Sequence, residues 1–154
     1  MVNEKELNET VTRLVEKGSG IQNEFVEKIL QSISIVYEPT RAAGFGDYKW
    51  GDLEPELRQE QRRIRKEYFK WKIETRQLIE LIIPNDIIPF DNSGEIIETY
   101  LEFSHGRFYR NDKNQKIKEF EDEFDLQINL MSSITPIVIQ RFISIYKPGE
   151  KRIS

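Results

Sequence analysis

The chain has 154 residues, no cysteine and a formal net charge of −4 at pH 7, with 32% charged and 38% hydrophobic residues. This composition predicts one folded domain over residues 1–154 and excludes a disordered chain, disulfides, thiol catalysis, cysteine-based zinc sites and a strongly basic nucleic-acid binder. Because the N-terminus is acidic and no apolar run approaches the roughly 20 residues of a membrane span, a cytoplasmic protein with no membrane contact is expected.

Two helices are expected before residue 38. Asn3 followed by Glu6 forms a capping-box pattern, in which each side chain can satisfy a free backbone N–H, so the first helix is expected to start there. The Gly-Ser-Gly tripeptide at 18–20 predicts its end, because glycine adopts the left-handed conformation common at helix C-termini. A second helix is expected over 21–37, where apolar residues recur at helical spacing before Pro39. Its end, residues 33–37, is rich in β-branched residues, and an extended segment is the alternative there.

Residues 38–53 are expected to form a loop that carries Phe45, Tyr48 and Trp50 among glycines. Two interpretations are open: these side chains cover the end of a helix bundle, or they contact a ligand or partner. The glycine spacing is not that of a phosphate-binding loop, because no Gly-Lys-Ser/Thr follows.

A long helix is expected from about 54 to 83, and the other elements are expected to be organised on it. Its apolar side repeats at alternating steps of four and three residues, which is typical of helices packed nearly parallel in a bundle. The residues of this side are Leu57, Gln61, Ile64, Tyr68, Trp71, Thr75, Leu78 and Ile82. Pro84 is expected to end the helix.

Three further helices are expected. One follows a second capping box at Asn92 and Glu95, the next covers about 114–133, and the last begins at Thr135-Pro136, where proline fits the first turn of a helix. No pair of segments shows the turn residues and alternation typical of a β-hairpin. The sequence therefore predicts an all-α fold with about six helices in a bundle.

Cations gather on the long helix, where eight Lys and Arg residues lie between positions 58 and 76 against three Glu. Five of these cations each follow a position of the apolar side and line one edge of the helix, here called the basic flank: Arg58, Arg62, Arg65, Lys72 and Arg76. Three interpretations are open: a solvated flank, a flank that pairs with an acidic partner or with the chain's own acidic helices, and a flank that binds nucleic-acid phosphates.

Residues suited to catalysis or metal binding are sparse. Glu95, Glu98 and Glu102 share one helix face, which is more typical of an exposed acidic face than of a metal site. His105 is the single histidine and the one catalytic candidate, and it forms one Glu-x-x-His spacing with Glu102, whereas di-iron bundles use two. No metal ligand and no cofactor is predicted.

The long helix resembles a helix of small uncharacterised prokaryotic all-helical proteins, in which Tyr-x-x-Trp is followed by a hydrophobic helix end and a proline, here Tyr68, Trp71 and Pro84. The resemblance implies an accessory role in a regulatory or defence locus, without catalytic residues. The chain is also similar to the HEPN family of helical ribonucleases, whose signature is an arginine, four to six residues, then a histidine. Residues 98–101 before His105 include no arginine, so this resemblance implies a non-catalytic relative.

The leading hypothesis is a non-enzymatic interaction module that docks a partner protein or a second copy of itself. Tyr48, Trp50 and the basic flank are the expected contact residues, because aromatic and arginine side chains dominate interface energetics. The alternative is a nucleic-acid-binding or RNA-cleaving helical domain that uses the basic flank and His105. A sensor of a small anionic ligand is the third hypothesis.

Overall fold

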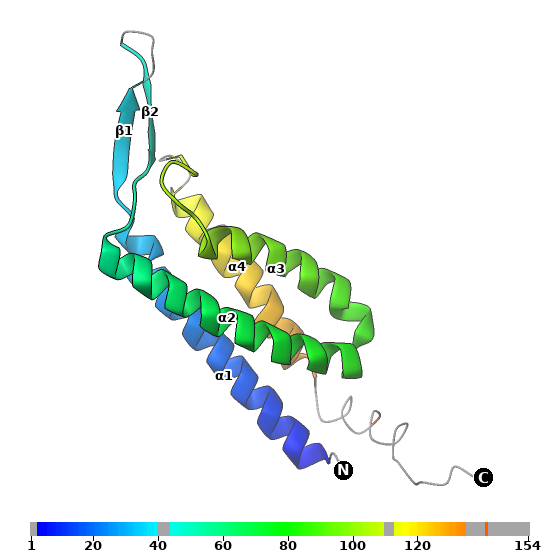
Figure 1. Ribbon diagram of the computed structural model, residues 1–154. Helices are drawn as coiled ribbons and strands as arrows, with labels where there is room; N and C mark the ends of the chain where they lie inside the picture. The colour runs from blue at the N-terminus through cyan, green and yellow to red at the C-terminus, as the bar shows by residue number, and fades with distance from the viewer. Residues whose placement is uncertain (1–2, 40–43, 110–112, 135–140, 142–154) are drawn as a thin grey trace, which may run out of the picture.

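The computed structural model describes residues 3–39, 44–109, 113–134 and 141. The elements in chain order are α1 (Glu4–Lys28), the 3₁₀ turn η1 (Leu30–Ser32), β1 (Ile35–Pro39), β2 (Gly46–Trp50), α2 (Pro55–Ile82), the 3₁₀ turn η2 (Pro84–Asp86), α3 (Ile87–Leu101) and α4 (Lys113–Ser132). The helices alternate in direction and α4 packs back on α1, so the described helices close into an up-and-down bundle (Figure 1). The hairpin of β1 and β2 rises from the end of the bundle where α2 begins.

The long helix α2 matches the prediction within a residue at each end. Pro55 occupies its first turn, where no backbone N–H is needed. The predicted apolar side is buried from Gln61 to Leu78. At its centre the rings of Tyr68 and Trp71 both lie 5.5 Å from the ring of Phe124 on α4, so α2 supplies the aromatic centre of the core.

The predicted break at residues 18–20 is wrong, because α1 runs through it. The predicted start is confirmed, since the Glu6 N–H donates to the Asn3 side chain at 2.8 Å. Gly18 is buried where α1 crosses α2, and a Cβ there would lie 2.7 Å from the Trp71 ring. Glycine at this position allows close helix packing rather than ending the helix.

The prediction of no hairpin is also wrong. α1 ends at Lys28, and residues 35–37, assigned to the end of a second helix, lie in β1 instead. Residues 38–39 and 46–50, assigned to a loop, complete β1 and form β2. The β-branched residues Ile35 and Val36 favour this extended conformation. β1 pairs antiparallel with β2, from Ile35 opposite Trp50 to Pro39 opposite Gly46. The Tyr37 ring lies over Gly46, where a Cβ would approach it to 2.4 Å, so a side chain at this position would displace the half-exposed ring.

The later helices differ from the prediction mainly at their starts. α3 begins at Ile87, so the predicted capping box at Asn92 is wrong, and Pro89 is accommodated in the first turn. α4 lies within one residue of its predicted bounds. The helix predicted from Thr135 lies outside the described residues. The described part of the chain thus holds four α-helices and a two-stranded sheet, a mostly helical fold rather than the predicted all-α bundle of about six helices.

Candidate interaction surfaces

Most of the basic flank of α2 faces α3. Lys72 pairs with Glu98 of α3 at 2.5 Å and Arg76 with Asp91 of α3 at 2.8 Å, and Arg65 pairs at 2.7 Å with Glu102, the residue that follows α3. The Arg76 guanidinium donates to both carboxylate oxygens of Asp91, and this holds the pKa of Asp91 below its usual value. The chain's own acidic helix therefore neutralises this part of the flank.

Arg58, at the start of the flank, joins α2 to the base of the hairpin. Its guanidinium donates to the Phe103 carbonyl at 2.8 Å and to the Gln61 side chain at 2.6 Å, and it pairs with Asp52. The hydrogen bond from Arg58 lowers the pKa of Asp52. Arg58 is 21% exposed and occupied by these contacts, so its role in this structure is to hold the ends of α2 and α3 together.

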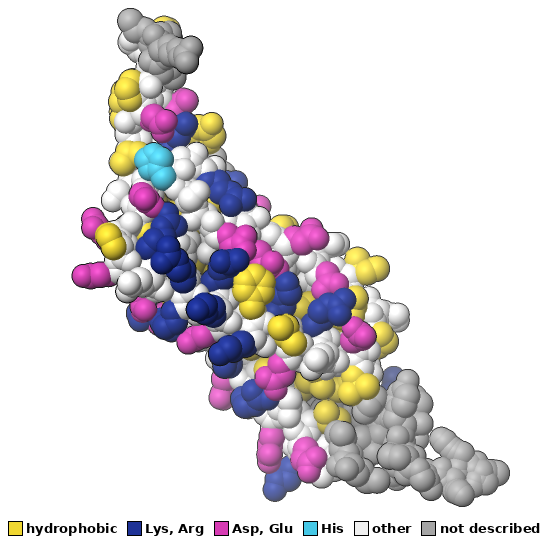
Figure 2. All heavy atoms as spheres, in the orientation of Figure 1, with side chains coloured by type: hydrophobic (Ala, Val, Ile, Leu, Met, Phe, Trp, Pro, Cys, Tyr) yellow, Lys and Arg dark blue, Asp and Glu magenta, His cyan; other side chains and the backbone are white. Residues whose placement is uncertain are grey.

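A different line of cations on α2 lacks such partners. Arg62, Lys66 and Lys70 are exposed, stand one turn apart, and form no ion pair within the described residues. Arg62 was predicted as a site residue, whereas the two lysines were not. Figure 2 shows Lys and Arg side chains gathered along the course of α2 on one face of the molecule, with the single histidine beside the hairpin. We call Arg62, Lys66 and Lys70 the outer cation line.

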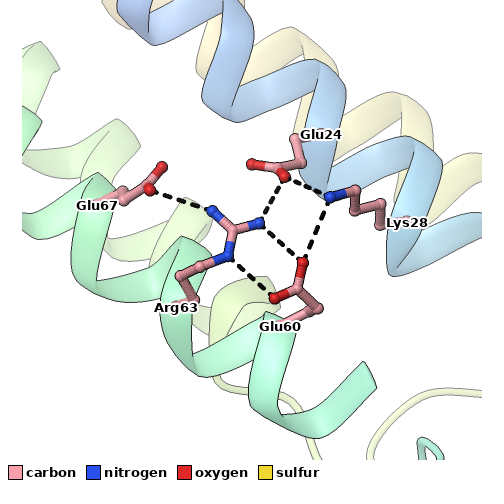
Figure 3. Close-up of polar contacts among 5 residues, drawn as sticks. All are labelled: Glu24, Lys28, Glu60, Arg63 and Glu67. Carbon is pink, nitrogen blue, oxygen red and sulfur yellow. Dashed lines mark hydrogen bonds and ion pairs between the residues drawn. The ribbon is translucent and has the colours of Figure 1, made fainter. Parts of the chain in front are cut away.

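The neighbouring Arg63 points the other way, toward α1. It donates to Glu60 at 3.0 Å and to Glu24 of α1 at 2.5 Å, and Lys28 joins the same two carboxylates (Figure 3). Hydrogen bonds from Arg63 and then Lys28 lower the pKa of Glu60 to about 2. This network links α1 to α2. Arg63 therefore has a structural role, unlike the three residues of the outer cation line.

His105 lies beside the hairpin. Its ring Nε2 is 3.7 Å from the Glu38 carboxylate of β1, and Lys49 of β2 approaches the same carboxylate at 3.7 Å. The His105 side chain is half-exposed, and these contacts give it a place in a polar cluster at the junction of the hairpin and the bundle.

The hairpin carries the predicted aromatic residues in two different environments. Trp50 is fully buried against Phe103 and Phe108, with ring centroids 5.5 Å and 4.6 Å away. Tyr48 is 47% exposed, and its ring centroid lies 5.2 Å from that of Tyr37, which is 50% exposed. The hairpin therefore has a buried anchor at its base and a surface aromatic pair further out. Tyr37 was missed because it was assigned to a helix.

The two strands differ in how their outer edges are covered. On the side of β2 away from β1, the Trp50 N–H donates to the Phe108 carbonyl and the Gly106 N–H donates to the Trp50 carbonyl, both at 2.9 Å. Lys49 also forms a bridge with Tyr109 on this side. β1 has no strand or backbone hydrogen bond on its outer side among the described residues. The hairpin therefore presents one open edge, that of β1.

Two searches of the described residues bear on other kinds of site. No group of three or more His, Asp or Glu side chains there is placed to hold a metal ion. None of the described helices combines the length and apolar character that crossing a bilayer requires.

Comparison of the chain with protein-family models, curated proteins and solved structures found no significant match.

Proposed function

We propose that this chain is a non-enzymatic protein-interaction module whose contact element is the β1–β2 hairpin. The observation that carries the proposal is the hairpin itself, which stands off the bundle with two half-exposed tyrosines and an open strand edge. Burying a large aromatic side chain contributes roughly 1.5–3 kcal/mol, and such residues are enriched among interface hot spots. The accessory role in a prokaryotic regulatory or defence locus, implied by resemblance, is part of the same proposal.

The rigid attachment of the hairpin supports this proposal. An isolated two-stranded hairpin is marginally stable in water. Here its base is held by buried Trp50 and by the backbone hydrogen bonds to the 106–108 segment. The chain thus holds Tyr37 and Tyr48 in a fixed geometry at the surface, which lowers the entropy lost when a partner binds.

Site-specific photo-crosslinking in cells that express the chain tests the proposal. A photoreactive phenylalanine derivative at Tyr48 is expected to form discrete protein adducts. The matched control is the same derivative at Ile73, an exposed apolar position of α2 that is 59% exposed. The Tyr37→Ser exchange should weaken the Tyr48 adducts. Equal adducts at both positions, or none at Tyr48, would count against the proposal.

The outer cation line favours a second candidate function, binding of single-stranded nucleic acid through its phosphates. Three cations that form no ion pair among the residues described here, spaced by one helical turn or about 6 Å, make a linear array of positive charge. Phe69 adds no free stacking surface, because the cationic groups of Arg65 and Lys72 lie 5.5 Å and 5.4 Å from its ring. The expected binding is therefore electrostatic and independent of base sequence.

Fluorescence anisotropy with labelled single-stranded RNA at several salt concentrations tests this second function. If all three cations contact phosphates, the triple variant with Gln at every position of the outer cation line should reduce the slope of log affinity against log salt by about 2. The control with the same change in net charge is Lys5→Gln, Lys17→Gln and Lys118→Gln, at exposed positions on α1 and α4. Absence of binding at low salt, or equal weakening by both triple variants, would exclude the function.

A further inference from the structure

We propose that β1 pairs with β1 of a second copy of this chain, so that two hairpins form one continuous four-stranded antiparallel sheet. The two-fold axis would pass between the two Val36 residues. This inference rests on the proposed function of the hairpin as the contact element, and it names the partner.

The hydrogen-bond pattern of the hairpin shows which groups of β1 point outward. In an antiparallel pair, facing residues alternate between pairs that exchange hydrogen bonds and pairs that do not. The Gly51 N–H donates to the Ser34 carbonyl at 2.7 Å, so Ser34 faces β2, and Val36 and Glu38 follow at steps of two. The backbone groups of Ile35 and Tyr37 therefore point away from β2.

The far side of β2 gives an independent check of this alternation. Trp50 stands opposite Ile35 in the register. Its N–H and C=O both bond to the 106–108 segment on the far side, away from β1. If Trp50 and Ile35 exchanged hydrogen bonds, these groups would be occupied by β1. The outward N–H and C=O of Ile35 and Tyr37 are thus two donors and two acceptors on an open edge.

Over residues 35–37, this edge also lacks the features that usually prevent strand addition. Natural edge strands are commonly protected by lysine, proline, a bulge or an inward-pointing charge. Residues 35–37 are Ile, Val and Tyr in regular register, and proline comes only at the outer end, at position 39. The one charge of the strand, Glu38, lies 3.7 Å from both the Lys49 ammonium and the His105 ring.

The sequence of β1 is self-complementary when two copies pair about Val36. Ile35 of each copy then stands opposite Tyr37 of the other, and these two pairs exchange all four outward hydrogen bonds. Pairs of β-branched and aromatic residues on one sheet face are favourable. Glu38 stands opposite Ser34, so no like charges face each other. Pairing about Tyr37 instead would place Glu38 opposite Val36.

The position of the hairpin makes this pairing accessible. β1 runs outward from the bundle, with Ile35 at its base and Pro39 at its outer end (Figure 1). Two antiparallel β1 strands therefore direct their helix bundles to opposite ends of the shared sheet. The tyrosine pair of each hairpin lies on the face that also carries Ile35, so the aromatic surface would continue across the dimer.

Cysteine crosslinking tests the register directly, because the chain has no cysteine of its own. In the proposed dimer the two Val36 positions form a non-hydrogen-bonded pair with Cα atoms about 4.5 Å apart, within the range of a disulfide. Val36→Cys should give a covalent dimer under mild oxidation in the folded state. Glu38→Cys is the control, since its two copies would be offset by four residues along the strands, roughly 14 Å. A dimer that forms equally with both variants would overturn the register.

Sedimentation equilibrium over a range of protein concentrations tests the hydrogen bonds. Tyr37→Pro removes an outward N–H without removing a hydrogen bond within the hairpin, and should raise the dimer dissociation constant by about tenfold or more relative to Tyr37→Thr. Tyr37→Thr loses the ring but keeps the N–H. A strictly monomeric parent chain, or a dimer unaffected by the proline, would overturn the inference. A monomeric chain that still forms Tyr48 adducts with a different protein would leave the proposed function standing.

Discussion

At the scale of single residues, Gly18 shows how one position sets the distance between two helices. The Trp71 indole N–H donates to the Leu14 carbonyl of α1 at 2.7 Å. This bond places the ring directly against Gly18, one turn further along α1, where no side chain would fit. Gly20, two residues later, has nothing within 4 Å of the position that its Cβ would take. The two glycines of α1 therefore differ in whether the structure leaves room for a side chain.

We expect opposite effects on stability when each is replaced by alanine. Gly20→Ala should stabilise the protein by roughly 0.5–1 kcal/mol, because alanine loses less conformational freedom in a helix. Gly18→Ala brings the same entropic stabilisation, but it also forces Trp71 to move. Overpacking of this kind costs about 1–3 kcal/mol. Urea denaturation of the two variants measures both effects. A Gly18→Ala variant at least as stable as the parent would show that the Trp71 contact does not restrict this position.

At the scale of elements, the hairpin combines a buried base with an exposed outer half. Trp50 is the largest of its buried side chains and packs against Phe103 and Phe108, which lie between α3 and α4 in the chain. It therefore connects the hairpin to the core of the bundle. Tyr48, two residues earlier on the same strand face, lies half-exposed. Alternation along one strand places the two residues on the same side, and distance from the bundle decides which is buried.

This difference predicts separate effects of the two substitutions. Trp50→Ala should destabilise the whole protein by about 3–5 kcal/mol, as expected for truncation of a buried aromatic side chain. Tyr48→Ala should change the free energy of unfolding by less than about 1 kcal/mol while weakening the contacts proposed for the hairpin. Thermal unfolding followed by circular dichroism, together with photo-crosslinking at a neighbouring position, separates stability from binding. A large loss of stability from Tyr48→Ala would place this residue with the fold rather than with the interface.

Long-range packing explains which elements could be predicted from the sequence. The bounds of α2 and α4 follow from periodicity within each segment, and both were predicted closely. Gly18 was misread as a helix end because its cause, the Trp71 ring, lies 53 residues away in the chain. Residues 35–37 fit either a helix end or a strand locally. Their strand pairing depends on residues 46–50 and on the anchoring of Trp50, which a local pattern does not show.

The same argument applies to the candidate site. The sequence shows that cations gather on α2, but which of them face α3 depends on where α3 packs. Once α3 lies antiparallel to α2, its acidic face meets Arg65, Lys72 and Arg76. The open edge of β1 could not be predicted, because residues 35–37 were expected to be helical. The position of the cations on α2 could therefore be predicted from the sequence. Which of them pair with other elements and which face solvent could not.

At the scale of the whole molecule, ion pairs with lowered carboxylate pKa values connect the elements. Glu24, Glu60 and Glu74 take part in contacts between α1 and α2, Asp91 joins α3 to α2, and Asp52 joins the hairpin exit to α2. In each case a hydrogen bond from an arginine is the main cause of the lowered pKa. Protonation of these carboxylates therefore removes interactions at several helix contacts together.

This arrangement predicts an acid-sensitive fold, with Glu60 as a defined contributor. Its pKa is about 2 in the folded protein against an ordinary value of 4.5, so the unfolded chain binds the proton more readily. The stabilising effect of Glu60 is complete above pH 4.5 and is lost as pH falls toward 2. Glu60→Gln should lower the melting temperature at neutral pH, and the difference from the parent should shrink across this window.

Thermal melts of the parent and the variant at a series of pH values measure this effect. The control is Glu16→Gln, an exposed glutamate of α1 that forms no ion pair within the described residues and gives the same change in net charge. Because Arg63 and Lys28 also hold Glu24, part of the network survives in the Glu60 variant, and the acid sensitivity should be reduced rather than abolished. A pH profile of Glu60→Gln that runs parallel to that of the parent would show that this network does not couple α1 and α2 energetically.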